Sequence, residues 1–278
     1  MEKITDWNIL WRELVENKEL SRKRNSEAEP KTDVWANRAH KFKEGVKRRW
    51  SQPDSSREYI ISQLDPNSTI LDIGAGTGDW AALLSRHAKS VTAIDPSASM
   101  IAVMRESLAA QRINNVSIIQ GSWPNVNVEP HDFSLCSHAM YGAIDLVSFI
   151  RQMVACTRQT CFLLLRAPSR DGVRAEAALH IWGQPMDSPN FTIAYNILIQ
   201  MGIYANVLME NTGLWKPHTN SSLEEALNDI KHYFGLDETS KHDDYFIELL
   251  NRRLTFKNSN YIWPPEVRSA LIYWQAGT

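Results

Sequence analysis

The sequence predicts an α/β fold, in which a doubly wound, mostly parallel sheet of seven strands carries N-terminal helices and a helical cap inserted before the last strand. Three observations predict it. Apolar runs alternate with helix-like stretches across residues 55–166, a glycine-rich turn follows the first run, and further apolar runs occupy 204–210 and 267–275. Strands that alternate with helices of about 10–15 residues favour a parallel sheet covered on both faces. The late pair could be the antiparallel strands that often finish the edge of such a sheet.

Residues 1–54 are polar and helix-prone, and we expect them to form an N-terminal helical segment. Apolar residues recur there at three- and four-residue steps, which places them on one helix face. These residues are Ile4, Trp7, Leu10, Trp11 and Leu14. A charged connector over 18–30 follows, and Thr32 or Asp33 could cap a second helix over 34–42.

Residues 55–210 are expected to form the core. Its predicted strands are 69–73, 90–95, 116–120, 132–137, 160–166 and 204–210. Its predicted helices are one that ends near residue 64, and 80–87, 98–112, 145–156 and 191–202. Pro, Gly and Arg in the stretch 169–190 predict an irregular excursion. Residues 211–262, with helical patterns at 221–234 and 243–254, are expected to form the cap, and 263–278 returns to the core.

Composition and charge exclude several classes of protein. Thirty Lys and Arg against 32 Asp and Glu give a formal net charge of −2, whereas a dedicated nucleic-acid-binding protein usually has a strong basic excess. Three cysteines without CxxC spacing argue against a disulfide framework or a zinc module, so no metal is expected. No apolar run approaches the roughly 20 residues that span a bilayer, and the charged start MEKITD is unlike a signal peptide. We therefore expect a cytoplasmic monomer or homodimer that binds neither nucleic acid nor membrane.

The strongest signal is the stretch LDIGAGTGDW at 71–80. An apolar strand runs into a glycine turn that opens a helix, which is the topology of a nucleotide-cofactor site at a switch point of the sheet. Gly74 and Gly76 let a ligand approach the backbone, because no Cβ is in the way and positive φ angles are available. Asp95 ends the second predicted strand about 20 residues further on, where a carboxylate can accept both hydroxyls of a ribose.

The spacing within this loop distinguishes between cofactors. A nicotinamide or flavin site typically has GxGxxG, with the pyrophosphate at the helix N-terminus. Here the spacing is GxGxG, position 79 is Asp, and Asp72 precedes the loop. Carboxylates near the helix start repel a pyrophosphate but suit a ligand with an ammonium and a sulfonium group. A nicotinamide-dependent oxidoreductase is therefore the weaker alternative.

These residues resemble a known family, the class I S-adenosylmethionine-dependent methyltransferases of the type 11 or 25 branch, over about residues 55–166. DIGAGTG at 72–78 looks like motif I of that family, and AIDPS at 93–97, with Met100, looks like motif II. QGSWP at 120–124 looks like the adenine-contacting segment. DFSLCSHAM at 132–140 resembles the family's fourth strand and the active-site edge behind it. WANRA at 35–39, with Phe42, resembles the N-terminal segment that covers the cofactor in this branch.

The resemblance implies a Rossmann-like methyltransferase fold, S-adenosyl-L-methionine as the cofactor, S-adenosyl-L-homocysteine as the product, and a cofactor lid within 1–54. Asp95 would bind the ribose, and Ser97, Ser122 and Trp123 would surround the adenine, although the family usually has Asp where Ser122 stands. The full implied cofactor set is Asp72, Gly74, Ala75, Gly76, Gly78, Asp95, Pro96, Ser97, Met100, Gly121, Ser122, Trp123, Ser137, Trp35, Arg38 and Phe42.

Methyl transfer from a sulfonium is an in-line displacement, so the protein mainly supplies position, a dry site and sometimes a base. His138 follows the fourth strand and could act as a base or line the acceptor pocket, and Tyr141 is a similar candidate. Arg166, Arg170 and Arg174 follow the fifth strand, where they could clamp a carboxylate or phosphate or could simply be solvated.

Absent motifs indicate the class of acceptor. SHAM at 137–140 lacks the (Asn/Asp)-Pro-Pro-aromatic motif of amino-methylating nucleic-acid enzymes, and no Pro-Cys pair offers the nucleophile of pyrimidine C5 methylation. The stretches 169–190 and 211–262 instead look like a substrate cap with aromatic walls, as small-molecule pockets tend to have. The expected pocket residues are Arg166, Arg170, Trp182, Tyr195, Trp215 and His218. We therefore expect methyl transfer to O, N, S or C of a small molecule, with an arginine-rich rim that favours an anionic acceptor.

One alternative comes from another class of protein. The fold could be a catalytically silent module that binds S-adenosylmethionine and regulates or scaffolds a partner, since fold does not fix function. The helix that carries Trp7 and Trp11 would then be the partner face.

Overall fold

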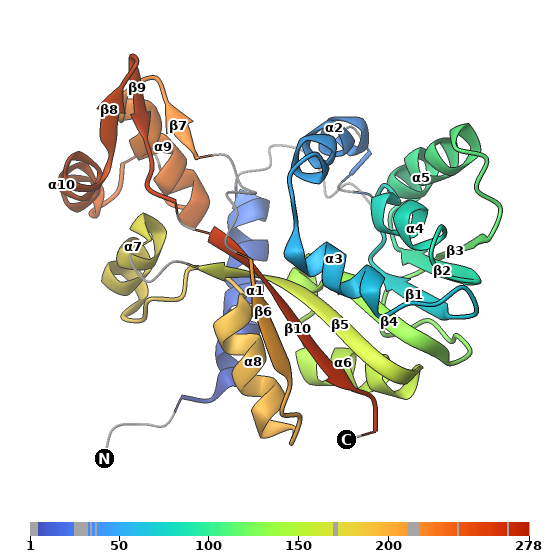
Figure 1. The fold of residues 1–278 in the computed structure, drawn as a ribbon. Coiled ribbons are helices and arrows are strands. Elements are labelled where there is room, and N and C mark those ends of the chain that lie inside the picture. The colour runs from blue at the N-terminus through green and yellow to red at the C-terminus, as the bar shows by residue number, and fades with distance from the viewer. Residues whose placement is uncertain are drawn as a thin grey trace.

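The computed structural model describes residues 5–24, 33, 35–36, 38–168, 172–210, 217–237, 239–265 and 267–277. At its centre lies the seven-stranded sheet that the sequence predicts (Figure 1). The strands lie in the order β3 (Val116–Gln120), β2 (Ser90–Asp95), β1 (Thr69–Ile73), β4 (His131–Ser137), β5 (Thr157–Pro168), β10 (Val267–Gln275) and β6 (Asn206–Met209).

Strand β10 is the reversed strand of this sheet. It pairs antiparallel with β5 on one side and with β6 on the other, whereas β1 to β5 pair in parallel. Strand β6 therefore runs with the parallel strands and forms the edge. The prediction that both late strands are antiparallel edge strands is therefore wrong in two respects. Strand β6 is an edge strand but runs parallel to β5, and β10 is antiparallel but does not lie at the edge, because it inserts between β5 and β6.

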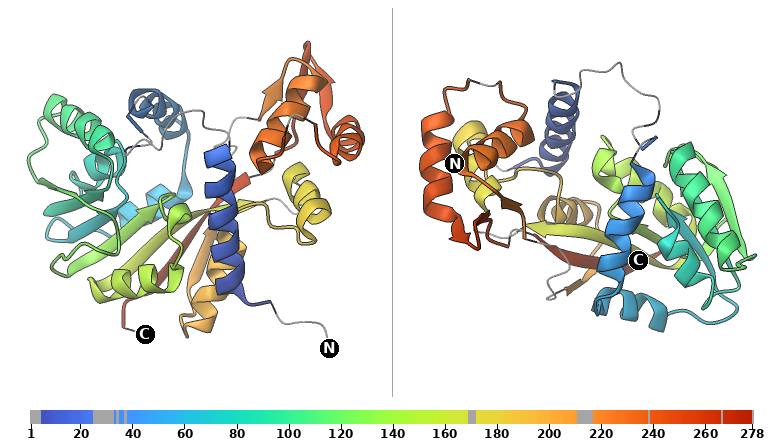
Figure 2. Two further views of the ribbon diagram at one scale, coloured as in Figure 1. Left: turned by 180° about the vertical axis from the view of Figure 1, so that it is seen from behind. Right: turned by 90° about the horizontal axis from the view of Figure 1, so that it is seen from above.

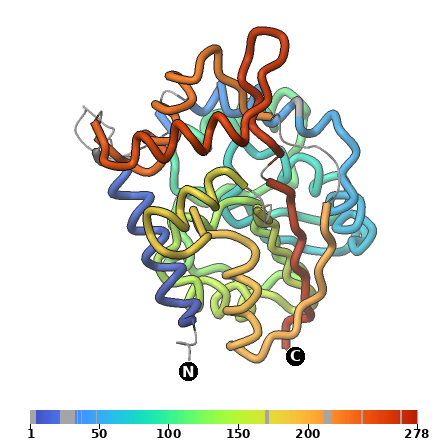
Figure 3. The backbone as a smooth tube through the Cα atoms, turned by 90° about the vertical axis from the view of Figure 1, so that its left-hand side faces the viewer, coloured from blue at the N-terminus to red at the C-terminus, as the bar shows by residue number. Residues whose placement is uncertain are grey.

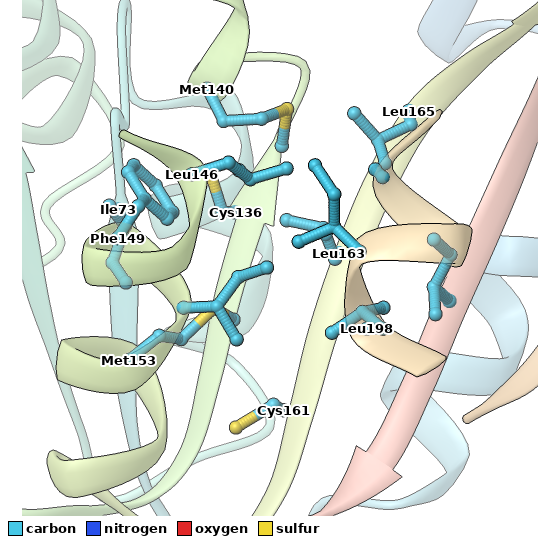
Figure 4. Close-up of a cluster of buried hydrophobic side chains, with 14 of the residues drawn as sticks. Ile73, Cys136, Met140, Leu146, Phe149, Met153, Cys161, Leu163, Leu165 and Leu198 are labelled. Carbon is cyan, nitrogen blue, oxygen red and sulfur yellow. The ribbon is translucent and has the colours of Figure 1, made fainter. Parts of the chain in front are cut away.

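Two sets of helices cover the two faces of the sheet, and β5 contributes to both. Cys161, Leu163 and Leu165 belong to one buried cluster, while Phe162 and Leu164 belong to the other, because successive strand residues point to opposite faces. Figure 4 shows part of the first cluster. Burying one such leucine contributes about 1.5–3 kcal/mol. The first cluster is covered by α1 (Trp7–Arg24), α6 (Leu146–Ala155) and α8 (Phe191–Gln200), and the second by α3 (Ser55–Ser62), α4 (Asp79–Leu84) and α5 (Ala98–Ala110).

Helix α1 is part of the core. Trp11 is 1% exposed, and its indole N–H donates a hydrogen bond to the carbonyl oxygen of Ala143 at 2.7 Å. This burial excludes the Trp7–Trp11 face as a free partner surface. It also means that α1 does not cover the glycine loop. The helix continues through Arg24, beyond the predicted start of the connector at 18, because its second half consists of good helix formers such as Lys, Glu and Leu.

The cap stands beyond the carboxyl end of β5 and has a core of its own (Figures 2 and 3). Its helices are α7 (Val173–Trp182), α9 (Leu223–Phe234) and α10 (Asp243–Arg253), and its small antiparallel sheet consists of β7 (Thr219–Asn220), β9 (Asn260–Ile262) and β8 (Thr255–Lys257). The sequence predicts two of these helices but not the small sheet. Helix α7 occupies the middle of the expected irregular excursion at 169–190, because Val173, Ala177 and Ala178 are fully buried in the core of the cap. None of the described helices is long and apolar enough to cross a bilayer.

Candidate active site

The glycine loop lies between β1 and α4, at the carboxyl edge of the sheet. Gly74 and Gly76 have φ angles of 72° and 56°, in the region that favours glycine. A Cβ on Gly74 would lie 2.2 Å from the Cβ of Ala139, so the chain after β4 packs directly against the loop. A Cβ on Gly76 would meet nothing nearer than the Phe42 ring, at 4.0 Å. The backbone at Gly76 is therefore accessible to a ligand.

Asp95 holds this loop from the end of β2. Its Oδ2 accepts a hydrogen bond from the Gly76 N–H at 2.8 Å, and its Oδ1 accepts one from the Ser97 N–H at 2.9 Å. Burial raises the pKa of this carboxyl group, although the two backbone donors oppose the shift. Each carboxylate oxygen can accept a second hydrogen bond. Asp95 can thus hold the loop and accept hydrogen bonds from ligand hydroxyls at the same time.

Asp72 lies in β1 at the base of the loop and is 1% exposed. Its Oδ2 has no hydrogen-bond partner among the described residues. Burial, together with the charges of Asp95 and Asp79, raises the pKa of Asp72 to about 7. A buried acceptor without a donor is costly. An ammonium group would supply both the donor and the opposite charge, so the residues fit a ligand that carries one.

The segment before and within α2 (Ala39–Trp50) covers the glycine loop. Trp35 and Phe42 form an edge-to-face pair with ring centroids 5.1 Å apart, and Phe42 lies over Gly76. Lys43 donates hydrogen bonds to the Thr77 carbonyl oxygen at 3.4 Å and to Ser107 at 2.8 Å. We call these residues, Asp33, Trp35, Phe42 and Lys43, the cover of the loop; α2 begins later than the predicted helix over 34–42.

Asp33 attaches the cover to the start of α5. Its carboxylate accepts hydrogen bonds from the Ser97 hydroxyl at 2.9 Å and from the Ser99 N–H at 3.0 Å. Burial opposes ionisation, but these donors and the Trp35 N–H prevail and lower the pKa of Asp33 to about 2. The sequence assigns Asp33 as a possible helix cap. The structure places it instead against Ser97, which is itself the N-cap of α5.

The remaining predicted cofactor residues surround the same loop, with different exposures. Gly121 donates its N–H to the Asp95 carbonyl oxygen at 3.1 Å, so the chain after β3 lies beside Asp95. The Trp123 indole donates to the Phe149 carbonyl oxygen at 3.1 Å, which holds that ring against α6. Ser122, Pro96 and Arg38 are exposed, and Met100 is buried under the cover. Ala75 and Gly78 lie on the loop after β1, and Ser137 is the last residue of β4.

His138 follows β4 with a φ of 55°, unusual for a residue other than glycine. Its ring nitrogens lie 2.9 Å from the Tyr141 hydroxyl and 3.1 Å from the Ser269 hydroxyl. Burial and the charges of Arg49 and Arg166 lower the pKa of His138 to about 3. The ring is therefore neutral at physiological pH, and both of its nitrogens are engaged.

Tyr141 links His138 to β5. Its hydroxyl accepts a hydrogen bond from the Arg166 N–H at 2.7 Å, and the Arg166 guanidinium lies 4.6 Å from its ring centroid. Burial raises the pKa of Tyr141 to about 12. The sequence did not predict Ser269 as a member of this group, because it reaches His138 only through the pairing of β10 with β5, in which Ser269 lies opposite Arg166.

The predicted pocket residues do not all meet at this edge. Arg166 lies at this edge, whereas Trp182 lies at the end of α7 in the cap, with its ring centroid 5.0 Å from that of Phe234. His218 pairs with Asp229 within the cap at 2.8 Å. Tyr195 packs in the core under α8 and donates to the Ala205 carbonyl oxygen at 2.9 Å, because its helix face is turned toward the sheet. Arg170 and Trp215 lie outside the described residues.

Comparison with known proteins identifies the core. Residues 70–160 match the family model described as Methyltransferase domain. In solved structures, the BH2331 protein of Bacillus halodurans shares the fold, with a TM-score of 0.55 and 13% identity over 81% of this chain and 99% of that one. Residues 70–160 of this chain thus resemble a methyltransferase domain, and the sheet that contains them has the class I methyltransferase fold. No group of three or more His, Cys, Asp or Glu side chains that could hold a metal ion occurs in the described part of the chain.

Curated relatives match about a third of this chain or less. The chain is 33% identical over 96 residues to demethylmenaquinone methyltransferase of Shouchella clausii, covering 33% of this chain and 40% of that one. It is 36% identical over 72 residues to protein-L-isoaspartate O-methyltransferase of Methanoregula boonei, covering 24% and 33%. The chain thus spans well under half the length of these relatives. Others are named for ribosomal RNA, so the relatives share methyl transfer and differ in acceptor.

Proposed function

We propose that the protein transfers a methyl group from S-adenosyl-L-methionine to a small-molecule acceptor. The observation that carries the proposal is the pair of buried carboxylates around Gly76: Asp72 has an oxygen without a donor, and Asp95 retains acceptor capacity beside the open backbone of the loop. Both carboxylates would repel a pyrophosphate. A ligand with an ammonium group and a ribose could instead donate hydrogen bonds to both carboxylates.

Different residues of the chain would bind different parts of the cofactor. Asp72 would accept a hydrogen bond from the ammonium of the cofactor's amino-acid part, and Asp95 would accept hydrogen bonds from the ribose hydroxyls. The backbone from Gly74 to Gly78 would hold the methionine and ribose part, and the chain around Ser122 would hold the adenine. Trp35 and Phe42 cover the loop and exclude water, and aromatic faces near a sulfonium add cation–π attraction.

When bound, S-adenosylmethionine supplies a methyl group already activated on its sulfonium. The protein therefore has to position the acceptor in line and keep the site dry. His138 is a poor base at a pKa of about 3, so we assign it and Tyr141 to positioning: together they fix the chain after β4 against β5 and β10.

A small acceptor is supported by the cap and by the charge of the chain. The cap has its own buried core and stands over the edge of the sheet where β5 ends, which restricts the approach of a large substrate. The formal net charge of −2 gives no general attraction for nucleic acid.

Calorimetric titration with S-adenosylmethionine and S-adenosylhomocysteine tests the proposal. We expect micromolar binding by the wild type and a loss of about tenfold or more in Asp95→Asn, since hydrogen bonds to a charged group contribute about 1.5–3 kcal/mol. Asp132→Asn is the matched control, because Asp132 also accepts two hydrogen bonds from a neighbouring strand, both from Thr69, at the opposite edge of the sheet.

The outcomes separate the proposed function from its alternatives. Equal loss in both variants would mean that the effect is structural. Binding of neither ligand by the wild type would overturn the proposal. Tight binding without methyl transfer to any member of a wide panel of small molecules would favour a silent cofactor-binding module. Label taken up only by a protein or an RNA would overturn the small-molecule acceptor.

A further inference from the structure

Arg166, near the end of β5, carries a largely buried guanidinium that forms no close ion pair with another described residue, although the charge of Asp187 acts on it from a greater distance. Among the described residues, no carboxylate lies within 4.0 Å of it. Its one guanidinium hydrogen bond is a long one, 3.3 Å from Nη2 to the Ser188 hydroxyl, and its Nε is buried without a partner. A buried charge is normally paired and hydrogen-bonded. The missing partner is therefore expected to come from a ligand.

A small cavity lies against this guanidinium. Its volume is about 20 Å³, and its walls come from the end of β5, the first turn of α7 and the loop before α8. The polar lining residues are Arg166, Arg174, Asp187, Ser188 and Asn190. A space of this size holds one small polar group, such as one or two water molecules. It would take an end group of an acceptor and not the whole molecule.

The charge of the lining favours an anion. The described lining residues include two guanidinium groups and one carboxylate, and that carboxylate, of Asp187, already accepts hydrogen bonds from the Tyr233 hydroxyl at 2.5 Å and the Ser188 hydroxyl at 3.2 Å. The Arg174 guanidinium is held over the Tyr233 ring, 4.3 Å from its centroid. The cavity also touches the N-terminal end of α7, where the helix dipole is positive.

We propose that this cavity binds a carboxylate group of the methyl acceptor, with Arg166 as its main partner and Arg174 as the second. The planar guanidinium fork matches the two oxygens of a carboxylate, and the small volume favours a carboxylate over a bulkier phosphate. Arg166 also contacts Tyr141, which contacts His138 at the end of β4. An acceptor anchored here would extend toward the edge where the glycine loop and the chain after β4 meet. The inference rests on the proposed function, because it names the class of acceptor.

Benzoate and benzamide are suitable probes, because they have nearly the same shape and differ in charge. Their binding to the protein in the presence of S-adenosylhomocysteine can be followed by ligand-observed NMR. We expect benzoate to bind at least tenfold more tightly than benzamide. Arg166→Gln is expected to weaken benzoate binding at least tenfold, and Arg166→Lys to weaken it less. Arg158→Gln is the matched control, since Arg158 lies at the other end of β5 with a side chain 55% exposed.

Each outcome is decisive. Equal binding of benzoate and benzamide by the wild type, binding of neither, or unchanged benzoate binding in Arg166→Gln would overturn the carboxylate site. This wild-type comparison still applies if Arg166→Gln fails to fold. Inorganic phosphate that displaces benzoate at a tenfold lower concentration would also overturn it, in favour of a phosphoryl group. If S-adenosylhomocysteine does not bind but benzoate binds through Arg166, the proposed function fails and the carboxylate site stands.

Discussion

The carboxylate of Asp33 lies 2.9 Å from the hydroxyl of Ser97, the residue that caps α5 and follows the loop carboxylate by two positions. This contact joins the cover to the carboxyl edge of the sheet, beside the glycine loop. Asp33 lies in the sequence between α1 and α2, and these two helices occupy different places: α1 is buried against the sheet, whereas α2 lies over the glycine loop.

Asp33→Ala is therefore expected to loosen the cover without unfolding the core. We expect a fall of about 1 kcal/mol in the free energy of unfolding by urea, typical of a lost cap or hydrogen bond, and a several-fold weaker affinity for S-adenosylhomocysteine. Because the folded pKa, about 2, is below the unfolded value of 3.8, the contribution is present above pH 4 and is lost as the pH falls toward 2. Asp65→Ala, which removes a similar local turn contact with Ser68, should leave the affinity unchanged.

Asp72 is expected to destabilise the ligand-free fold at neutral and alkaline pH. Its folded pKa, about 7, lies above the unfolded value of 3.8, so stability falls as the pH rises from about 4 to 7. Asp72→Asn should therefore be more stable than the wild type at pH 8, by a few kcal/mol, and this difference should shrink toward pH 4. Urea unfolding at several pH values measures it; a difference that is independent of pH would contradict the assignment.

The same carboxyl group should release a proton when the cofactor binds. An ammonium beside Asp72 favours the ionised form, so binding at pH 6 converts a protonated carboxyl into a carboxylate. Calorimetry of S-adenosylmethionine in buffers of different ionisation enthalpy should detect a release approaching one proton per site at pH 6 and close to none at pH 8. Asp72→Asn should abolish it, and Asp132→Asn should not.

His138 is expected to remain neutral across the physiological range. Its folded pKa, about 3, lies below the unfolded value of 6.5, so it opposes folding increasingly as the pH falls below 6.5. NMR of the ring nitrogens should show one of the histidine rings without titration between pH 5 and 8, and that signal should be missing in His138→Gln. Titration of His138 near pH 6.5 would restore it as a candidate base.

Two alanine substitutions in the glycine loop should separate packing from binding. Gly74→Ala would bring a methyl group to 2.2 Å from Ala139, so we expect a loss of stability of several kcal/mol and little soluble protein. Gly76→Ala would make only an ordinary contact with the Phe42 ring, at 4.0 Å, and incurs the left-handed backbone strain of about 1–2 kcal/mol. It should fold and yet bind S-adenosylhomocysteine at least tenfold more weakly; intact binding would show that the ligand does not pass over Gly76.

Features encoded over a short stretch of chain could be predicted from the sequence. The glycine turn, the strand before it and Asp95 lie within a single β-α-β unit, so their spacing alone indicates a cofactor site, and the Asp95 contact with Gly76 agrees with that. The periodic residues of α1 correctly predicted a helix. They could not show what covers its apolar face, since a core face and a partner face have the same pattern.

Features that depend on distant pairing could not be predicted. His138 and Ser269 are 131 residues apart and meet only because β10 inserts beside β5. The cavity at Arg166 likewise needs α7, which the sequence analysis missed because Pro, Gly and Arg in 169–190 predicted an irregular excursion, although the stretch between Gly172 and Gly183 contains good helix formers. Asp187 and Ser188 gave no signal in the sequence, because their significance comes from the guanidinium groups that they face.

The connection from β6 to β10 is, in topological terms, a hairpin that has been opened to hold most of the cap. Its two ends stay joined, since the Glu210 N–H donates to the Ser269 carbonyl oxygen at 2.8 Å. Glu210 is also held by α3, because its carboxylate accepts hydrogen bonds from the N–H and the hydroxyl of Ser55, both at 2.7 Å. An insertion that leaves and re-enters at adjacent, anchored points leaves the strand register unchanged. A change in the length or sequence of that excursion is therefore expected to alter the surface presented to an incoming molecule while leaving the glycine turn and its carboxylates in place.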